Sequence, residues 1–203
     1  PEGVTGIDKR PVEGPVRVAA PGPKGIGGSG LAGDAVCKKQ HHGGDDQAVY
    51  AVAREDLDDW GRELGRTLPN GFFGENLTTS GADVSGALIG ERWRIGSEVV
   101  LEITSARIPC GTFQGHMGEQ RWVKRFTQKG APGAYLRVIQ PGEIRSGDPV
   151  EVVHRPDHEV TVALAFRAMT TERALQPRLL AAGEALHPEV RQWAREYVEK
   201  YGA

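Results

Sequence analysis

The sequence predicts a mostly β protein in which a barrel-like sheet carries a few helices and is followed by a small helical extension. Three observations lead to this fold class. Between about residue 4 and residue 165, short β-branched runs alternate with glycine-rich turn signals. One of these runs, 99–104, has a clean period of two, and from about residue 170 the apolar residues recur with helical spacing. We therefore expect a β-barrel domain over residues 1–168 and a helical extension over residues 169–203.

The strands are expected where β-branched runs fall between turn residues. The segment 99–104 gives the clearest pattern, because Val99, Leu101 and Ile103 share one face of an extended chain. Similar runs predict strands over 15–19, 135–139, 150–153 and 160–164. The segment 48–53 is compatible with either a strand or a helix.

Helices are expected in fewer places. Between residues 55 and 65, Leu57, Trp60 and Leu64 follow one another at spacings of three and four, and Gly65 closes the segment. After residue 170 the pattern is helical throughout. Pro188 opens the last predicted helix, whose apolar stripe includes Val190, Trp193, Ala194, Tyr197, Val198 and Tyr201.

Composition excludes several classes of protein. The 203 residues carry 25 basic and 27 acidic side chains, a net charge of −2, which provides no field for nonspecific nucleic-acid binding. No apolar run is long enough for a membrane span, and residues 1–6 lack the pattern of a signal peptide. Two cysteines are too few for a disulfide framework, a four-cysteine iron–sulfur cluster or a zinc knuckle. A reducing cytoplasm is the expected compartment, and no nucleic-acid or membrane partner is expected.

Residues 25–30 match the spelling G-x-G-x-x-G, which in dinucleotide-binding proteins cradles a pyrophosphate. The motif works where its glycines join a strand to a helix that points its N-terminus at the phosphate. Here the following segment, 31–44, holds four glycines and no amphipathic period. We therefore predict an irregular loop over residues 21–30 and no nucleotide site.

Cys110 is the leading candidate for a chemical role. It follows the best strand of the chain, lies between Pro109 and Gly111, and has Arg107 three residues before it, where a cation would favour a thiolate. This setting indicates a ligand or a nucleophile. A free cysteine can also be a small buried hydrophobic residue. A cysteine protease would need His41 or His42 as its base, which the sequence allows but does not specify.

Three further segments admit a structural and a functional interpretation. His41 and His42 precede Gly43 and Gly44, so one histidine could line a site where backbone amides approach an anion, but a surface turn is the simpler interpretation. Because neighbouring side chains point in different directions, the two histidines are not expected to share a metal. Two other sets of polar residues could anchor loops or bind a polar ligand: Glu75 and Asn76 between apolar flanks, and Arg137 within an apolar run.

Taken in order, these motifs resemble the MOSC domain, named from the C-terminal domain of molybdenum cofactor sulfurases. The resemblance is strongest to stand-alone bacterial proteins of the branch linked to N-hydroxylaminopurine resistance, which carry a three-helix C-terminal extension. It covers nearly the whole chain and rests on the segments 5–12, 33–34, 42–44, 73–77, 89–90, 107–110 and 133–138. It implies a β-barrel-like fold.

The resemblance also implies a pocket for the molybdenum cofactor, a pterin dithiolene (molybdopterin) that bears a phosphate. Cys110 would supply the thiolate ligand to molybdenum, in agreement with the preference of soft metals for thiolates. His42 would deliver a proton, and glycine amides near it, at Gly43 and Gly44, would complete the cradle. The charged oxygens of the cofactor would be offset by Lys9, Arg107 and Arg137, and Glu75 and Asn76 would hold the pterin edge or a neighbouring loop.

The implied activity is the reduction of N-hydroxylated compounds such as base analogues and amidoximes to the amine and water. Electrons would come from an external donor of the flavin reductase or ferredoxin type, because Cys37 and Cys110 cannot build an iron–sulfur relay. Two alternatives use the same pocket: a non-catalytic carrier or storage protein for the cofactor, and a sulfur carrier with a persulfide on Cys110. The sequence leaves open whether the protein is a monomer or a homodimer.

Overall fold

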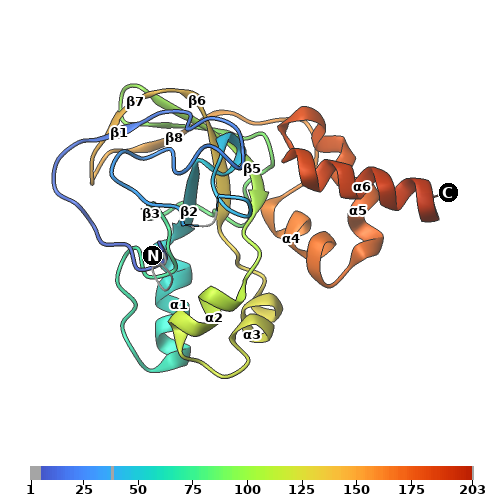
Figure 1. The fold of residues 1–203 in the computed structure, drawn as a ribbon, viewed down its shortest axis with the longest axis horizontal. Coiled ribbons are helices and arrows are strands. Elements are labelled where there is room, and N and C mark those ends of the chain that lie inside the picture. Colours follow the sequence, from blue (N-terminus) through green and yellow to red (C-terminus); the bar gives the residue numbers. More distant parts are fainter. Residues whose placement is uncertain (1–5, 38, 203) are drawn as a thin grey trace.

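The computed structural model describes residues 6–37 and 39–202 and confirms the predicted fold class, a curled sheet with several helices and a helical C-terminal part (Figure 1). Six strands form the main sheet in the order β3-β2-β6-β5-β4-β8, and β1 pairs with β7 in a smaller sheet. The strands are β1 (Val16–Val18), β2 (Val49–Ala53), β3 (Leu77–Thr79), β4 (Arg92–Ile95), β5 (Val99–Ala106), β6 (Ala134–Gln140), β7 (Gly142–Ile144) and β8 (Val150–His154).

Strand β5 is the centre of the sheet and leads to Cys110. It pairs antiparallel with β4 on one side and with β6 on the other, where the register shifts twice. The alternating pattern predicts one buried face, but both faces are buried, and the polar residues of the second face therefore need partners. The Thr104 hydroxyl donates to the carbonyl of Asp46 at 2.6 Å, and Glu102 accepts from Arg92 at 2.7 Å.

Six α-helices and three short 3₁₀ segments are present among the described residues. They are α1 (Arg54–Leu64), α2 (Gly111–Met117), α3 (Trp122–Lys129), α4 (Val162–Thr170), α5 (Gln176–Leu179), α6 (Pro188–Tyr201), η1 (Asp45–Gln47), η2 (Arg173–Leu175) and η3 (Leu180–Ala185). Helix α1 confirms the prediction for 55–65, and Gly65 ends it in the left-handed conformation. Segment 48–53, ambiguous in the sequence, contains β2.

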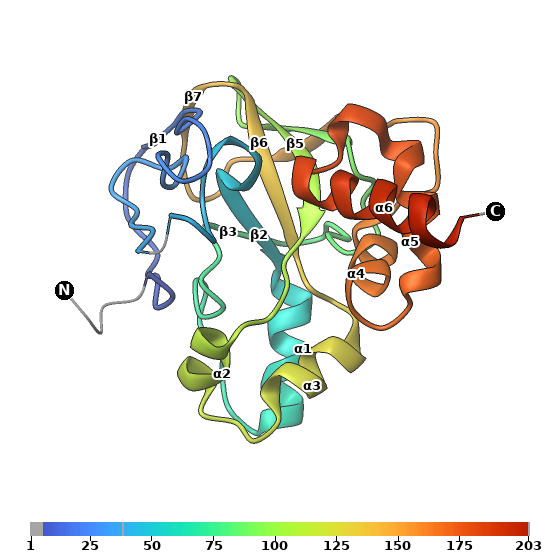
Figure 2. The same ribbon diagram turned by 45° about the vertical axis from the view of Figure 1, so that its right-hand side comes forward.

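Helices α2 and α3 were not predicted, because tertiary packing rather than a long amphipathic pattern stabilises them. They lie with α1 at one end of the sheet (Figures 1 and 2). Buried aromatic rings join them: the Phe113 and Trp122 centroids are 5.3 Å apart, and Trp60 of α1 lies 4.4 Å from Trp122. Edge-to-face and tilted pairs of this kind add to the burial of their surface.

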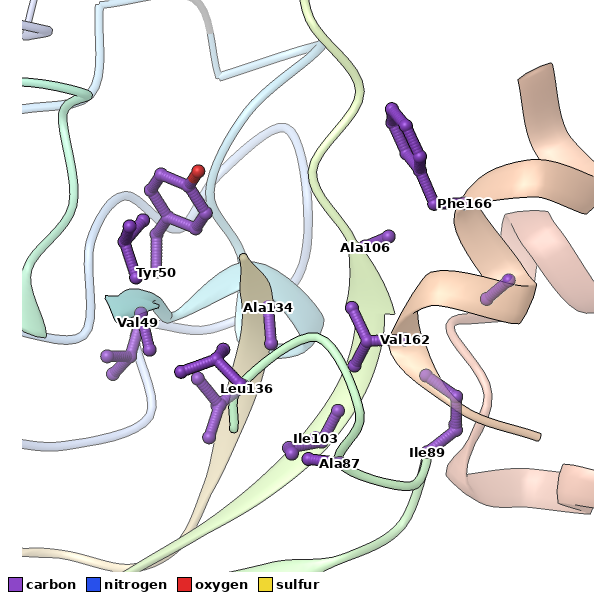
Figure 3. Packing of buried hydrophobic residues seen from close by; sticks show 14 of the residues in the cluster. Val49, Tyr50, Ala87, Ile89, Ile103, Ala106, Ala134, Leu136, Val162 and Phe166 are labelled. Carbon is purple, nitrogen blue, oxygen red and sulfur yellow. The ribbon is translucent and has the colours of Figure 1, made fainter. Parts of the chain in front are cut away.

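The strand prediction for 160–164 is wrong, because residues from Val162 onward form α4. The Thr161 hydroxyl accepts a hydrogen bond from the amide of Leu164 at 3.0 Å and so caps the helix. Val162 and Phe166 pack beside Ile103 and Ala106 of β5 (Figure 3). The helical part of the chain thus begins within the range predicted for the barrel domain, and the division at residue 168 stays a prediction.

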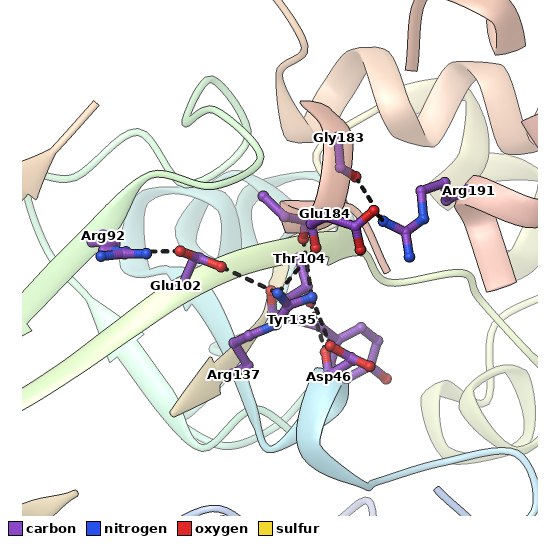
Figure 4. A network of polar contacts seen from close by, with 10 residues as sticks. Asp46, Arg92, Glu102, Thr104, Tyr135, Arg137, Gly183, Glu184 and Arg191 are labelled. Atoms are coloured by element: carbon purple, nitrogen blue, oxygen red, sulfur yellow. Dashed lines mark hydrogen bonds and ion pairs between the residues drawn. The ribbon is translucent and has the colours of Figure 1, made fainter. Parts of the chain in front are cut away.

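A polar network joins the sheet to the C-terminal helices (Figure 4). Arg137 of β6 contacts Asp46 at 2.6 Å and Glu102 at 3.2 Å, and it donates to the carbonyls of Glu184 and Ala185. The Arg137 guanidinium thereby connects η1, β5 and η3, three segments that are far apart in the sequence. None of the helices in the described ranges is long and apolar enough to cross a bilayer.

The G-x-G-x-x-G segment is an irregular loop, as predicted, and the described residues between 31 and 44 form no helix. Its turns are closed by backbone hydrogen bonds, and the amide of Gly22 donates to Asp45 at 2.8 Å. The loop lies against the His42-Gly43-Gly44 segment. A Cβ atom on Gly43 would approach the carbonyl oxygen of Gly28 to 2.5 Å, so only glycine allows this contact.

Candidate functional site

A cavity opens where β5 ends, and Cys110 lies in its wall. We call it the Cys110 cavity and define it by Lys9, Asp34, Cys37, His42, Gly43, Tyr50, Asn76, Arg107 and Cys110, with further lining residues from the same loops. Of the predicted site residues, it therefore collects Lys9, His42, Gly43, Asn76, Arg107 and Cys110.

Cys110 is positioned by the segment that leaves β5. Pro109 is buried and Cys110 half-buried, and Cys110 precedes the first residue of α2 with an extended backbone. The thiol is therefore partly sealed by the core yet open to the cavity, which is the exposure that a metal ligand or a nucleophile needs. Cys110 also packs against the hydrophobic core, so its role as a ligand or a nucleophile stays a prediction.

Arg107 brings an uncompensated positive charge to the cavity wall. Its side chain is buried, with 6% of the residue exposed, and its guanidinium lies 3.6 Å from the centroid of the Phe113 ring. The Nη1 atom is buried and has no hydrogen-bond partner. Since buried charges are normally paired, this arrangement indicates that an anion belongs beside Arg107.

Two tyrosines next to Arg107 remain protonated donors. Burial raises the pKa of Tyr50, an effect that the Arg107 charge reduces without cancelling, and burial likewise raises the pKa of Tyr135. The Tyr50 hydroxyl donates to the carbonyl of Pro132 at 2.8 Å. Neither phenol can therefore act as the anionic partner of Arg107.

Lys9, which lines the same cavity, already has a partner. Its ammonium lies 2.6 Å from Asp34, whose carboxylate also accepts from the Asn76 amide at 2.7 Å. Burial alone would raise the pKa of Asp34, but hydrogen bonds from Lys9, Ser29 and Asn76 bring the pKa below its ordinary value. Asp34 stays ionised and orients Lys9, a role that the Gly33-Asp34 motif does not reveal by itself.

Three residues predicted to bind the cofactor have other partners and do not line the Cys110 cavity. The Glu75 carboxylate accepts from the amides of Gly71 and Phe73 and from the Thr78 hydroxyl, so it anchors its own loop. The Gly44 amide donates to the carbonyl of Gly28 at 3.0 Å. Arg137 belongs to the network with the C-terminal helices.

The two histidines separate, as expected for neighbouring side chains. His42 lines the Cys110 cavity, whereas His41 is exposed and does not. Among the described residues, no group of three or more His, Cys, Asp or Glu side chains could hold a metal ion. A metal at this site would therefore depend on Cys110 and on ligands brought by a cofactor.

Sequence reasoning missed three residues of this cavity. Cys37 shares the cavity with Cys110, and Tyr50 and Gln47 line it as well. Cys37 lies in a loop without regular structure. No local pattern of the sequence could have placed it in one cavity with Cys110, which lies more than seventy positions later.

The fold and the site together define the class of this protein. The fold is a curled six-stranded sheet. Just after the end of strand β5 lie the half-buried Cys110 and the buried Arg107, whose Nη1 atom has no hydrogen-bond partner. Residues 38–151 match the family described as the MOSC domain. The chain belongs to this family, within the bacterial branch that includes the YiiM and YflK proteins.

Individual relatives support this placement. The uncharacterized protein YflK of Bacillus subtilis is 32% identical over 163 residues, covering 80% of this chain and 70% of YflK. YiiM of Escherichia coli is 32% identical over 161 residues, covering 76% of this chain and 71% of YiiM. A protein of Gibberella moniliformis named "Reductase" is 30% identical over 139 residues, which are 66% of this chain but only 24% of that protein.

Solved structures agree with the fold. The crystal structure of YiiM from Geobacillus stearothermophilus has a TM-score of 0.77 and 27% identity, covering 95% of this chain and 89% of that one. YiiM from Escherichia coli has a TM-score of 0.74 and 25% identity, covering 93% and 87%. The similarity thus includes the C-terminal helices.

Proposed function

We propose that this protein is a molybdenum-cofactor-dependent reductase of N-hydroxylated compounds such as base analogues and amidoximes. The observation that carries the proposal is the presence, in one cavity, of the half-buried Cys110 thiol and the buried guanidinium of Arg107, whose Nη1 atom has no hydrogen-bond partner. Membership of the MOSC family and the relative named "Reductase" support an oxidoreductase.

The donor set fits this cofactor. A thiolate at Cys110 would bind molybdenum, and Arg107 would pair with an anionic oxygen of the cofactor, which a planar guanidinium binds well. Lys9, held by its ion pair with Asp34, would add a hydrogen-bond donor to the same cavity. When bound, the cofactor supplies the two-electron cleavage of the N–O bond, in which a hydroxylamine, two electrons and two protons give an amine and water.

The chain's own residues would bind the substrate and supply a proton to the departing oxygen. His42 lies in the cavity wall, where an imidazole can release a proton near neutral pH, so we assign it the delivery of one proton to the departing oxygen. We propose that electrons come from a flavin reductase or ferredoxin-type protein, since the two cysteines cannot form a four-cysteine cluster. The proposal places the reaction in the cytoplasm, which keeps Cys110 reduced.

The test is reconstitution with molybdenum cofactor and a viologen reductant, followed by measurement of the conversion of 6-N-hydroxylaminopurine to adenine. C110A is expected to lose turnover and the molybdenum bound per protein chain. C37A, which removes the other thiol of the same cavity, is the matched control and is expected to keep both. Normal turnover by C110A would refute the assignment.

Arg107 offers a test that does not depend on activity. R107M removes a buried charge that forms no ion pair with a carboxylate among the described residues, while it keeps apolar contact with Phe113. The variant is expected to be at least as stable as the wild type without cofactor, because an unpaired buried charge is costly. Its cofactor affinity should fall about tenfold or more, the effect of a lost charge-assisted hydrogen bond. Unchanged affinity would contradict the role of Arg107.

A sulfur-carrier function is the second candidate, favoured by the presence of Cys37 and Cys110 in one cavity. A cysteine desulfurase would transfer a sulfur atom to a thiolate of the protein and leave a persulfide. Mass spectrometry after incubation with the desulfurase and cysteine would then find Cys110 heavier by one sulfur atom. An unmodified Cys110 would count against this function and leave the reductase proposal standing.

A further inference from the structure

A second cavity lies at the seam between the sheet and the C-terminal helices, beside the Cys110 cavity. We call it the helix-side cavity and define it by Ile108, Met169, Val190 and Trp193 on its apolar side and by His41 and His187 on its polar side. Figures 1 and 2 place α4 and α6 beside β5 at this seam. The cavity is therefore built partly by the barrel and partly by the helices.

The apolar wall exposes a tryptophan. Trp193 is 50% exposed, whereas Trp60, Trp93 and Trp122 are buried to within 2%. Ile108, also exposed at 42%, lines the same cavity. Large apolar side chains exposed around a hollow are typical of a binding site, and an indole favours a planar ring as its partner.

The two cavities are neighbours. His42, Gln47 and Tyr135 line both of them, and Ile108 in the second is only two residues from Cys110 in the first. The Oε1 atom of Gln47 is buried without a hydrogen-bond partner. An unsatisfied acceptor at the shared wall needs a donor, such as the N–H or O–H of a hydroxylamino group.

The fixed charges at the rim are paired. The Lys24 ammonium lies 2.7 Å from each carboxylate oxygen of Glu189, which connects the glycine-rich loop to α6. Burial lowers the pKa of His187, which is therefore neutral at pH 7. With Lys24 already compensated, the cavity favours an uncharged ligand over a phosphorylated one.

We propose that the helix-side cavity holds the uncharged, planar aromatic part of the substrate, with its ring against Trp193 and its N-hydroxylamino group donating to Gln47. This inference rests on the proposed function and adds to it the place where the ring of the substrate lies. Helix α6 thereby contributes to substrate selection by the barrel.

Fluorescence tests the site without turnover. Because Trp193 is the exposed tryptophan among four, adenine added to the cofactor-free protein is expected to quench its emission saturably, and AMP is expected to quench it at least tenfold more weakly. W193F should lose the quenching. Quenching that persists in W193F, or equal binding of AMP, would overturn the proposal.

Kinetics provide the second test. W193A should lower kcat/KM for 6-N-hydroxylaminopurine about tenfold relative to that for N-methylhydroxylamine, which has no ring to stack, and W193F should restore most of the ratio. Y201A, which removes an aromatic residue 63% exposed on the same helix but outside the cavity, should change neither value. A ratio unaltered by W193A would refute the substrate site while the reductase function stands. Absence of turnover in every variant would refute the reductase function, and the adenine titration would still decide the binding site.

Discussion

Replacing Glu75 by alanine is expected to destabilise the protein strongly. The carboxylate is 2% exposed and accepts three hydrogen bonds: from the amides of Gly71 and Phe73 at 2.6 and 2.9 Å and from the Thr78 hydroxyl at 2.9 Å. E75A leaves two buried amides without an acceptor. Because each unsatisfied donor costs about 1–3 kcal/mol, the free energy of unfolding should fall by about 3–5 kcal/mol.

The conservative variant E75Q removes the charge of Glu75 and keeps the shape of its side chain. E75Q keeps an oxygen acceptor but turns an NH₂ group toward a backbone donor, so we expect about half the loss, roughly 2 kcal/mol. For a protein of this size, a loss of 3 kcal/mol lowers the melting temperature by about 6–12 °C. Guanidinium and thermal unfolding would measure both variants.

The control for this series is E143Q, which changes an exposed carboxylate on β7 and should alter stability by less than about 0.5 kcal/mol. The reasoning would be refuted if E75A unfolded at the wild-type guanidinium concentration while its cofactor affinity fell. That outcome would make Glu75 a cofactor ligand instead of the anchor of the turn that packs against Lys9.

Three further predictions concern stability. Burial, followed by the charges of nearby acidic residues, raises the pKa of Asp56 to about 6. Between about pH 4 and pH 6 the folded state therefore holds a proton that the unfolded chain releases. Stability consequently falls as the pH rises through this range. D56N should flatten this dependence and gain about 1 kcal/mol at pH 7, a value discounted for solvent screening; denaturation at pH 4.5 and 7 would show it, and an unchanged slope would contradict it. Burial lowers the pKa of His187, so the stability that neutral His187 contributes is present above pH 6.5 and is lost as the pH falls below that value. H187N, which can still cap α6, should therefore lose less stability between pH 7.5 and 5.5 than the wild type. An equal loss would assign the acid sensitivity to another group. R137M removes a partner of buried Glu102 and should lower the free energy of unfolding by about 2–4 kcal/mol. Amide hydrogen exchange should become faster in η3 and α6 than in β2. Uniform exchange would show that Arg137 does not connect the helices to the sheet.

The sequence could predict those features that depend on neighbouring residues. The period of two over Val99–Ile103 defines β5, and Pro109 and Gly111 place Cys110 just beyond its end. Helix α1 follows from its apolar spacing and ends at Gly65, whose left-handed conformation costs a glycine little. These features are local, so the residues alone could indicate them.

The roles of Arg107 and Arg137 illustrate what local pattern leaves open. Arg107 and Arg137 both follow or interrupt apolar runs, yet Arg107 lies unpaired in the cavity wall and Arg137 is held by Asp46 and Glu102. The difference depends on which segments pack against each guanidinium. Partners 35 positions away or more cannot be read from the flanking residues.

The sequence by itself determined strands β1, β5, β6 and β8, the position of Cys110 and the family resemblance, because periodicity, turn chemistry and ordered motifs are properties of short segments. Only the tertiary structure decided that Glu75 anchors a loop, that Cys37 shares the cavity with Cys110 and that residues from Val162 form a helix. The apolar run after Thr161 suits a strand or a buried helix equally well. Five of the nine residues of α4 are buried, and a helix satisfies the backbone hydrogen bonds of such a segment internally.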